Sequence, residues 1–199
     1  MGTKALKKRD IWQNSSGKKA EQAEHNFCDV FLKEFEDTDF TIRANPKEFK
    51  HIYVDIELSE KVLAEIYTPD IEIKKHGLAP DYAIDNKKTK KSLYVEVKRQ
   101  DGWVEGKPRS AGRGNAHERS CKYFTPGLLK ILRENGKLGD DILPFWTVFQ
   151  GDITRDPCRV REITCWFAEH SAHFFMWRNS ADSTELIAHF NKRLKYLLA

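Results

Sequence analysis

The spacing of apolar residues in the first third of the chain predicts helices. Between Ala20 and Glu36, apolar side chains recur every three or four positions, as in an amphipathic helix; they are Ala23, Phe27, Val30, Phe31 and Phe35. Ser59 is a suitable N-cap for a second, shorter helix that carries Val62, Leu63 and Ile66. Residues 1–18 are polar and basic without such periodicity, so we expect a flexible basic arm, either a solvated tail or a segment that contacts phosphates.

The pattern then changes to the two-residue period of a β-strand. Leu93, Val95 and Val97 alternate with Tyr94, Glu96 and Lys98, which is typical of a half-buried strand. The sequence PDYAID (residues 80–85) has the composition of a partner strand, and NKKTKK (86–91) is a short polar connection. Together these stretches predict a β-hairpin.

The remainder of the chain alternates helices with strands. Helices are expected from Asn115 to about Phe124, with Glu118 completing a capping box, and from Thr125–Pro126 to Gly136. Further helices are expected after Asp156–Pro157 and after Ser183. The apolar runs LPFWTVFQ (143–150) and HFFMWR (173–178) predict two strands, the first buried on both faces. This order predicts a three-layer α/β domain with a mixed sheet.

Length and composition fit one globular unit. With 199 residues, 40% of them hydrophobic, the chain can fill one sizeable core, so we expect a single domain over residues 19–199. The net charge of +4 is too small to establish a polyanionic partner, which has to be argued from local clusters. There is no apolar run of about 18 residues and no signal-like N-terminus, so we expect a cytoplasmic protein without membrane contact.

The cysteines do not predict a metal site or disulfides. In the cytoplasm they are expected to be reduced. None of the four has the paired spacing of a zinc knuckle, and His117, four residues before Cys121, has no second pair to complete a tetrahedral site. We interpret them as small core or surface residues; they are Cys28, Cys121, Cys158 and Cys165.

The hairpin register predicts which polar residues face one another. In an antiparallel ladder the numbers of opposing residues have a constant sum, and a sum of 177 places Asp81 opposite Glu96. Asp81, Glu96 and Lys98 then share one face, while Leu93, Val95 and Val97 point to the core. An even sum would turn one carboxylate toward the apolar side, so the pattern selects a cluster of two carboxylates and one lysine.

This cluster has the composition of a metal-dependent hydrolytic site. Two carboxylates about 5 Å apart on neighbouring strands repel each other and attract a cation. Mg²⁺ suits the position, because it takes one or two carboxylates, several waters and a substrate phosphate. A lysine beside the ion can hold or deprotonate the attacking water and offset charge in the transition state. Metal-assisted phosphodiester hydrolysis is thus indicated; the structural alternative is a charged sheet edge.

A second group with similar letters, TPDIEIKK (68–75), does not form such a cluster. Asp70 and Glu72 are two residues apart with no hairpin between them, so they cannot face each other across strands. We expect a solvated segment there.

The segment GKPRSAGRGNAHERSCK (106–122) suits contact with DNA. Its glycines allow close approach to a polyanion, and a helix N-terminus favours phosphate. Arginine can bind guanine and asparagine can bind adenine in bidentate fashion, while glutamate accepts from an exocyclic amine. Asn115, Glu118 and Arg119 fall within about one helical turn. The alternative is a capped helix with an exposed Glu–Arg pair and no contact with DNA. The segment follows directly after the carboxylate cluster, and this position favours a nuclease with sequence preference.

These motifs resemble those of the restriction endonuclease-like nucleases, in which Pro-Asp is followed by Glu-x-Lys. Longer stretches resemble the MunI family of type II restriction endonucleases, and GNAHERS also resembles the recognition element of EcoRI-related enzymes. The likeness is strongest from about Pro80 to Thr164, and its stretches are EVKRQDGWVEGK, SAGRGNAHERSCK, FTPGLLK, LPFW and GDITRDPCRVREIT. It implies a restriction endonuclease-like fold with a central mixed five-stranded sheet flanked by helices.

The resemblance also implies roles for individual residues. Asp81 and Glu96 correspond to Mg²⁺ ligands, with the backbone carbonyl of Val97 as a third, and Lys98 to the lysine near the attacking water. Glu24, on the first helix, is a further candidate for the metal site. The recognition element comprises Arg113, for the outer guanine, and the residues around the inner AATT, which are Gly114, Asn115, Ala116, Glu118 and Arg119.

The activity implied by the resemblance is Mg²⁺-dependent cleavage of double-stranded DNA at C/AATTG, which leaves 5′-AATT overhangs and 5′-phosphates. A palindromic site requires a twofold-symmetric reader, so a homodimer is expected, with a cognate DNA methyltransferase as its functional counterpart in a prokaryotic cell. Two other functions fit the same fold: a structure- or damage-directed nuclease, and a DNA-binding regulator on a retired nuclease fold. Discrete plasmid fragments would exclude the first, and cleavage by the wild-type protein with Mg²⁺ the second.

Overall fold

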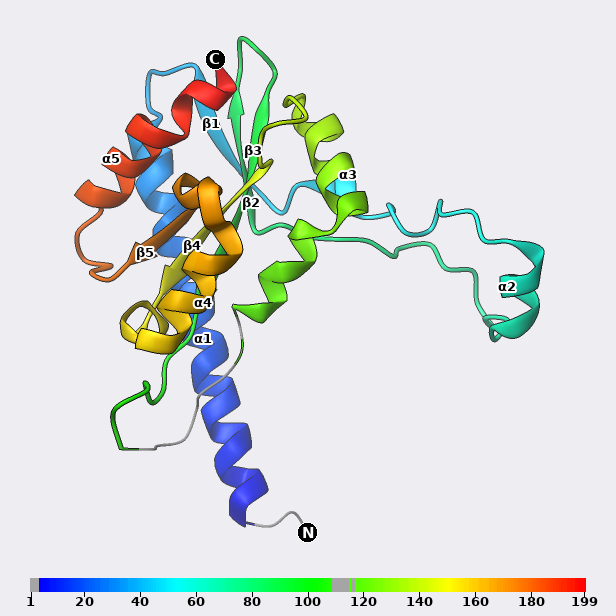
Figure 1. Cartoon of the computed structure of the whole chain (residues 1–199), viewed down its shortest axis with the longest axis horizontal. Helices are drawn as coiled ribbons and strands as arrows, with labels where there is room; N and C mark the ends of the chain where they lie inside the picture. The colour runs from blue at the N-terminus through cyan, green and yellow to red at the C-terminus, as the bar shows by residue number, and fades with distance from the viewer. Residues whose placement is uncertain (1–3, 109–114, 116) are drawn as a thin grey trace.

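The centre of the molecule is a five-stranded mixed sheet with the strand order β1-β2-β3-β4-β5 (Figure 1). The computed structural model describes residues 4–108, 115 and 117–199, with side chains from residue 17 onward. β1, β2 and β3 are antiparallel neighbours, whereas β4 and β5 run parallel to β3. The strands are β1 (Phe40–Ala44), β2 (Tyr82–Asn86), β3 (Ser92–Arg99), β4 (Phe145–Gln150) and β5 (Phe174–Trp177).

Helices cover both faces of this sheet. On one face, α1 and α5 bring aromatic side chains around Trp146 of β4. On the other face, α3 and α4 enclose a second core in which Phe167 packs against Phe145. This arrangement confirms the predicted three-layer fold class. The α-helices are α1 (Lys4–Glu34), α2 (Glu60–Glu65), α3 (Pro126–Gly136), α4 (Pro157–Phe167) and α5 (Thr184–Arg193).

In the part of the chain that the structure describes, five short 3-10 helices connect these elements. They are η1 (Lys47–Phe49), η2 (Glu118–Phe124), η3 (Asp152–Arg155), η4 (Ala168–His173) and η5 (Lys195–Leu198). Within the described ranges, none of the helices has the length and apolar content needed to cross a membrane.

Most helix boundaries agree with the residues that predicted them. The Asp156 carboxylate caps α4 by accepting two backbone N–H groups of its first turn. Pro126 begins α3, but Gly136 is its last residue, and the left-handed position belongs to Lys137 with a φ of 52°. Glycine suits position 136 for another reason, since a Cβ there would lie 2.5 Å from the carbonyl oxygen of Ser92.

Three elements of the structure differ from the predictions. Helix α1 begins at Lys4, so residues 4–18 are helical rather than irregular, and the division into a basic arm and a domain stays a prediction. Strand β1 was not expected from the pattern; it is only five residues long and is held by pairing with β2. The helix expected from Asn115 is the 3-10 helix η2, which begins at Glu118 with His117 as its N-cap.

Residues 54–73 form a projection that extends away from the body and carries α2 (Figure 1). The base of this projection is closed by backbone hydrogen bonds from Tyr53 to His76 (3.0 Å) and from Leu78 to Phe49 (2.9 Å). As predicted, the hydroxyl of Ser59 caps α2. Every residue of the projection is exposed, which confirms the solvated segment expected at 68–75.

Candidate active site

Asp81, Glu96 and Lys98 come together where β2 begins beside β3. The ammonium nitrogen Nζ of Lys98 lies 2.6 Å from Oε1 of Glu96 and 3.4 Å from Oδ2 of Asp81. The side chains of Lys98 and Asp81 are each 17% exposed and that of Glu96 is 6% exposed. The structure therefore places the predicted cluster of two carboxylates and one lysine in a largely enclosed position.

The pairing of β2 with β3 explains this convergence. Ala83 pairs with Tyr94 and Asp85 pairs with Ser92, which is the predicted register. Val95 and Val97 are buried against the core beneath α1, so Glu96 and Lys98 face the opposite side of the sheet, toward Asp81. That side is not open to solvent along the whole strand, however. Tyr94 and Glu96 are buried too, because residues of η2, α3 and β4 cover them, so the half-buried strand predicted from the alternation is wrong.

Two further contacts hold the carboxylates in place. The backbone N–H of Val97 donates a hydrogen bond of 2.7 Å to Oδ2 of Asp81. The hydroxyl of Tyr123 donates a hydrogen bond of 2.8 Å to Oε2 of Glu96. Tyr123 is buried in η2, and this role was not predicted, since an aromatic residue in the run KYF predicts only core packing.

The charges of the cluster are not balanced within the chain. Burial, together with the charge of Glu96, raises the pKa of Asp81 to about 7 despite the opposing effect of Lys98. Burial lowers the pKa of Lys98, but the charges of Glu96 and Asp81 outweigh this and raise it above its usual value, so the ammonium form persists. When Asp81 is ionised, one ammonium cannot neutralise two carboxylates, and the site then favours a second cation.

The residues present fit a hard divalent ion. Lys98 Nζ also lies 3.3 Å from the carbonyl oxygen of Val97, so three oxygens, from Asp81, Glu96 and Val97, already surround one cationic group. Among the described residues no group of three or more His, Cys, Asp and Glu side chains is placed to hold a metal ion. The donor set here consists of two carboxylates and one backbone carbonyl. An all-oxygen donor set is the kind that Mg²⁺ and similar ions prefer.

Glu24 of α1 is electrostatically linked to the same cluster. Burial raises the pKa of Glu24, the charge of Lys98 lowers it and the charge of Glu96 raises it again. Its half-buried carboxylate therefore lies within range of both side chains. A part for Glu24 in metal binding stays a prediction.

The recognition residues predicted from the sequence lie around the start of η2. Arg113, Gly114 and Ala116 fall outside the described residues. Asn115 and Glu118 are exposed, and the side-chain amide of Asn115 donates a hydrogen bond of 2.8 Å to Oε2 of Glu118. Arg119 is exposed as well. Because η2 also carries Tyr123, a single short helix links this segment to Glu96.

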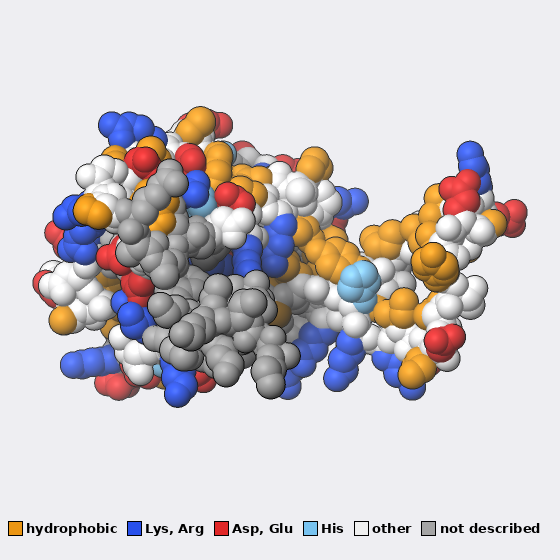
Figure 2. Space-filling model, turned by 90° about the horizontal axis from the view of Figure 1, so that it is seen from below, with side chains coloured by type: hydrophobic (Ala, Val, Ile, Leu, Met, Phe, Trp, Pro, Cys, Tyr) orange, Lys and Arg blue, Asp and Glu red, His pale blue; other side chains and the backbone are white. Residues whose placement is uncertain are grey.

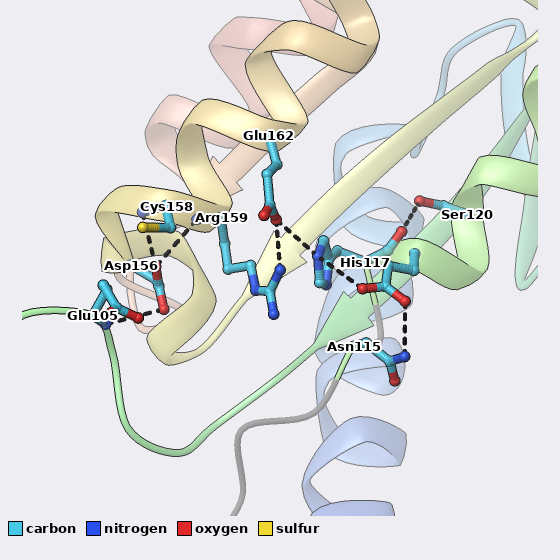
Figure 3. A network of polar contacts seen from close by, with 9 residues as sticks. Glu105, Asn115, His117, Ser120, Asp156, Cys158, Arg159 and Glu162 are labelled. Carbon is cyan, nitrogen blue, oxygen red and sulfur yellow. Dashed lines mark hydrogen bonds and ion pairs between the residues drawn. The ribbon is translucent and has the colours of Figure 1, made fainter. Parts of the chain in front are cut away.

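A buried histidine supports the same segment from beneath (Figure 3). His117 is 0% exposed, and its ring stacks on Trp166 of α4 with an interplanar angle of 10°. Its Nε2 lies 3.2 Å from Oε2 of Glu162, which also accepts a bond of 2.7 Å from Arg159. Burial and the charge of Arg159 lower the pKa of His117, so the neutral ring donates its Nε2–H to Glu162. From the sequence, His117 was considered only as a possible zinc ligand, without a second ligand pair to complete the site.

Lys and Arg side chains lie at several places on the face of the body shown in Figure 2, interspersed with Asp and Glu.

Comparisons with known proteins identify relatives that match the whole chain. The family model described as type II restriction enzyme MunI matches residues 1–199. A curated type II restriction enzyme MunI from Mycoplasma sp is 51% identical over 201 residues, which cover 100% of both chains. The crystal structure of MunI restriction endonuclease in complex with cognate DNA superposes with a TM-score of 0.81 and 51% identity, over 94% of this chain and 97% of that one.

The matches extend over the whole chain and include both the carboxylate cluster and the segment around η2. They therefore cover both parts of the chain for which the sequence predicts separate roles, hydrolysis and reading of the DNA. The chain belongs to the MunI family of type II restriction enzymes.

Proposed function

We propose that this restriction enzyme cleaves double-stranded DNA at the palindrome CAATTG, after the first C of each strand, in a Mg²⁺-dependent reaction. The observation that carries the proposal is the convergence of oxygens from Asp81, Glu96 and Val97 on Lys98, beside the helix that begins with the recognition residues. Duplex DNA as substrate is supported by a relative of 51% identity that was solved with its cognate DNA.

The side chains of the cluster have distinct parts in this proposal. Asp81, Glu96 and the carbonyl of Val97 would hold Mg²⁺, which supplies Lewis-acid stabilisation of the phosphate and lowers the pKa of bound water. Lys98 positions the attacking water and offsets negative charge on the phosphorane-like transition state. Tyr123 and the N–H of Val97 keep the two carboxylates oriented. The water oxygen bonds to phosphorus, the P–O3′ bond breaks and the 3′ oxygen takes up a proton, which leaves 5′-phosphates and 5′-AATT overhangs.

Sequence reading is assigned to the segment around η2. Arg113 would bind the outer guanine, and the exposed side chains of Asn115, Glu118 and Arg119 would contact the inner AATT, with Gly114 and Ala116 allowing close approach. The pair Asn115–Glu118 supports this assignment, because their hydrogen bond fixes one side-chain amide and one carboxylate relative to each other at the start of η2.

The proposed site has a consequence for assembly. A palindrome presents the same half-site twice, so two copies of the chain related by twofold symmetry would place one catalytic cluster on each strand. A DNA methyltransferase that modifies the same sequence is the expected functional counterpart, without physical contact.

Digestion of a plasmid with known CAATTG positions tests the proposal. We expect discrete fragments at those positions alone, only when Mg²⁺ is added, and end sequencing should give 5′-AATT overhangs. Fragments that end at GAATTC or at other AATT-centred sites would show that the enzyme recognises a different outer base pair. Cleavage without sequence preference would contradict the proposal.

A substitution of Arg113 tests whether this residue recognises the outer base pair. Arg113→Ala should lower discrimination at that pair by roughly 1 to 3 kcal/mol. The measurement compares cleavage of CAATTG with sites changed at the outer pair. Unchanged preference would remove Arg113 from the reading role and leave the rest of the assignment intact.

A further inference from the structure

Exposed apolar side chains gather on one part of the molecule, the projection formed by residues 54–73. Eleven large hydrophobic residues are exposed in the described part of the chain, and nine of them lie on the projection. Tyr67 is 100% exposed and Ile71 is 81% exposed. Figure 2 shows these side chains along the projection. The nine residues are Val54, Ile56, Leu58, Val62, Leu63, Ile66, Tyr67, Ile71 and Ile73. Such a concentration marks an interaction surface.

Contacts at the base of the projection fix the point where it leaves the body of the molecule. In addition to the two backbone hydrogen bonds there, the rings of Tyr53 and His76 pack edge-on with a centroid distance of 5.1 Å. At Gly77 the two chain segments touch so closely that a Cβ would lie 2.6 Å from the carbonyl carbon of Lys50. The apolar side chains are therefore presented outward, to something other than the core of the same chain.

The charge of the projection excludes DNA as that partner. Residues 54–73 carry six carboxylates and one lysine, a net charge of −5 that phosphates would repel. The whole chain has a net charge of +4, so the remaining residues carry +9. The rest of a second copy thus carries net charge of the sign that an acidic projection requires.

The nine side chains would add apolar area to such an interface. They are between 38% and 100% exposed, and a standard interface buries about 800 Å² of each partner. In a twofold dimer both projections contribute, because each surface patch occurs on both subunits.

We propose that the projection packs against a second copy of this chain and forms part of the interface of a homodimer. The proposal rests on the proposed function, in which a palindromic site is read by two copies. It adds the surface that joins them: an acidic, apolar segment of one protomer lies on the basic body of its partner.

Sedimentation analysis of the full chain without DNA or metal tests the proposal. Tyr67→Ser combined with Ile71→Ser should raise the dimer dissociation constant roughly tenfold or more, because both side chains would lose burial in the interface. The matched control is Leu32→Ser combined with Tyr196→Ser, whose side chains are 52% and 67% exposed but lie outside the projection. This control should dimerise like the wild type, and circular dichroism should show that both variants are folded.

Three results would overturn the proposal: a wild-type chain that stays monomeric at every concentration, a projection variant that dimerises as tightly as the wild type, or a control that dissociates equally. The proposed cleavage is judged separately. A failed plasmid digest leaves the free protein's mass unaffected, and a dimer interface elsewhere leaves cleavage at CAATTG possible.

Discussion

Tyr123 donates a hydrogen bond of 2.8 Å to Oε2 of Glu96, while Lys98 contacts the other oxygen of that carboxylate at 2.6 Å. Both oxygens of Glu96 are thus held by the chain itself. Because η2 runs from Glu118 to Phe124, the helix that begins with proposed recognition residues also fixes a proposed metal ligand near its end.

Tyr123→Phe should lower the cleavage rate roughly tenfold, since the supporting partners of a metal ligand typically contribute 10- to 100-fold. Affinity for the cognate duplex should not change, because the hydroxyl faces Glu96 rather than solvent. Single-turnover cleavage and binding without metal measure the two effects, with Tyr196→Phe as an exposed control. A wild-type rate in Tyr123→Phe would show that the remaining contacts suffice to orient Glu96.

Asp81→Ala and Lys98→Ala should separate binding from catalysis. Asp81→Ala is expected to abolish cleavage yet keep or tighten binding, because it removes a negative charge near the scissile phosphate. Lys98→Ala should depress cleavage far more than affinity, by roughly 100-fold or more in rate. Gel-shift binding and plasmid cleavage measure both, and Asp140→Ala, at an exposed loop position, is the control. Equal losses of rate and affinity for Lys98→Ala would make this lysine a phosphate anchor.

The metal-free protein should lose stability as the pH rises through about 7. Asp81 has a folded-state pKa of about 7, above its ordinary value of 3.8, so its contribution is fully present below the ordinary value and is lost as the carboxyl ionises. Asp81→Asn cannot ionise and should show a smaller fall in melting temperature between about pH 5 and about pH 8. Thermal unfolding in a chelator measures this.

Added Mg²⁺ supplies an internal check on that prediction. An ion that binds the ionised cluster should restore the melting temperature of the wild type at the higher pH, but not that of Asp81→Asn. If the two proteins responded alike to both pH and Mg²⁺, Asp81 would not be the group responsible.

Glu162→Ala should weaken binding of the cognate DNA indirectly, through the support that Glu162 gives to η2. The change removes the acceptor of the buried His117 and of Arg159, and an unsatisfied buried donor costs roughly 1–3 kcal/mol. We expect η2 to shift and cognate affinity to fall about tenfold, which corresponds to about 1.4 kcal/mol. Binding to a scrambled duplex should stay the same. The control is Glu134→Ala on α3, an exposed side chain paired with Lys130; a comparable loss on both duplexes would instead indicate general destabilisation.

The carboxylate cluster could be predicted because its information is local. Alternation in β3 fixes which side chains share a face, and the apolar set permits only registers that bring Asp81 to the side of Glu96. Neither step depends on the rest of the fold. The N-caps at Ser59 and Asp156 were predictable for the same reason.

What the sequence did not predict depends on contacts between distant segments. Tyr123 reaches Glu96 across 27 positions of the chain, and nothing in its neighbours marks it. The burial of Tyr94 follows from the layer above β3, and the apolar residues of the projection look like ordinary core positions until their exposure is seen. In each case the local pattern is correct and the tertiary context decides its meaning.

The burial of β3 and the exposure of the start of η2 predict different local stabilities for the two regions. β3 is hydrogen-bonded to β2 and β4 and largely buried, whereas Asn115 and Glu118 lie exposed at the edge of a 3-10 helix. Amide hydrogens around Glu96 should therefore exchange with solvent only when the whole domain opens, and those near Glu118 through small local openings. On the proposed roles, the geometry of the carboxylate cluster would be set when the chain folds, whereas the exposed segment around Glu118 would readjust at each encounter with DNA.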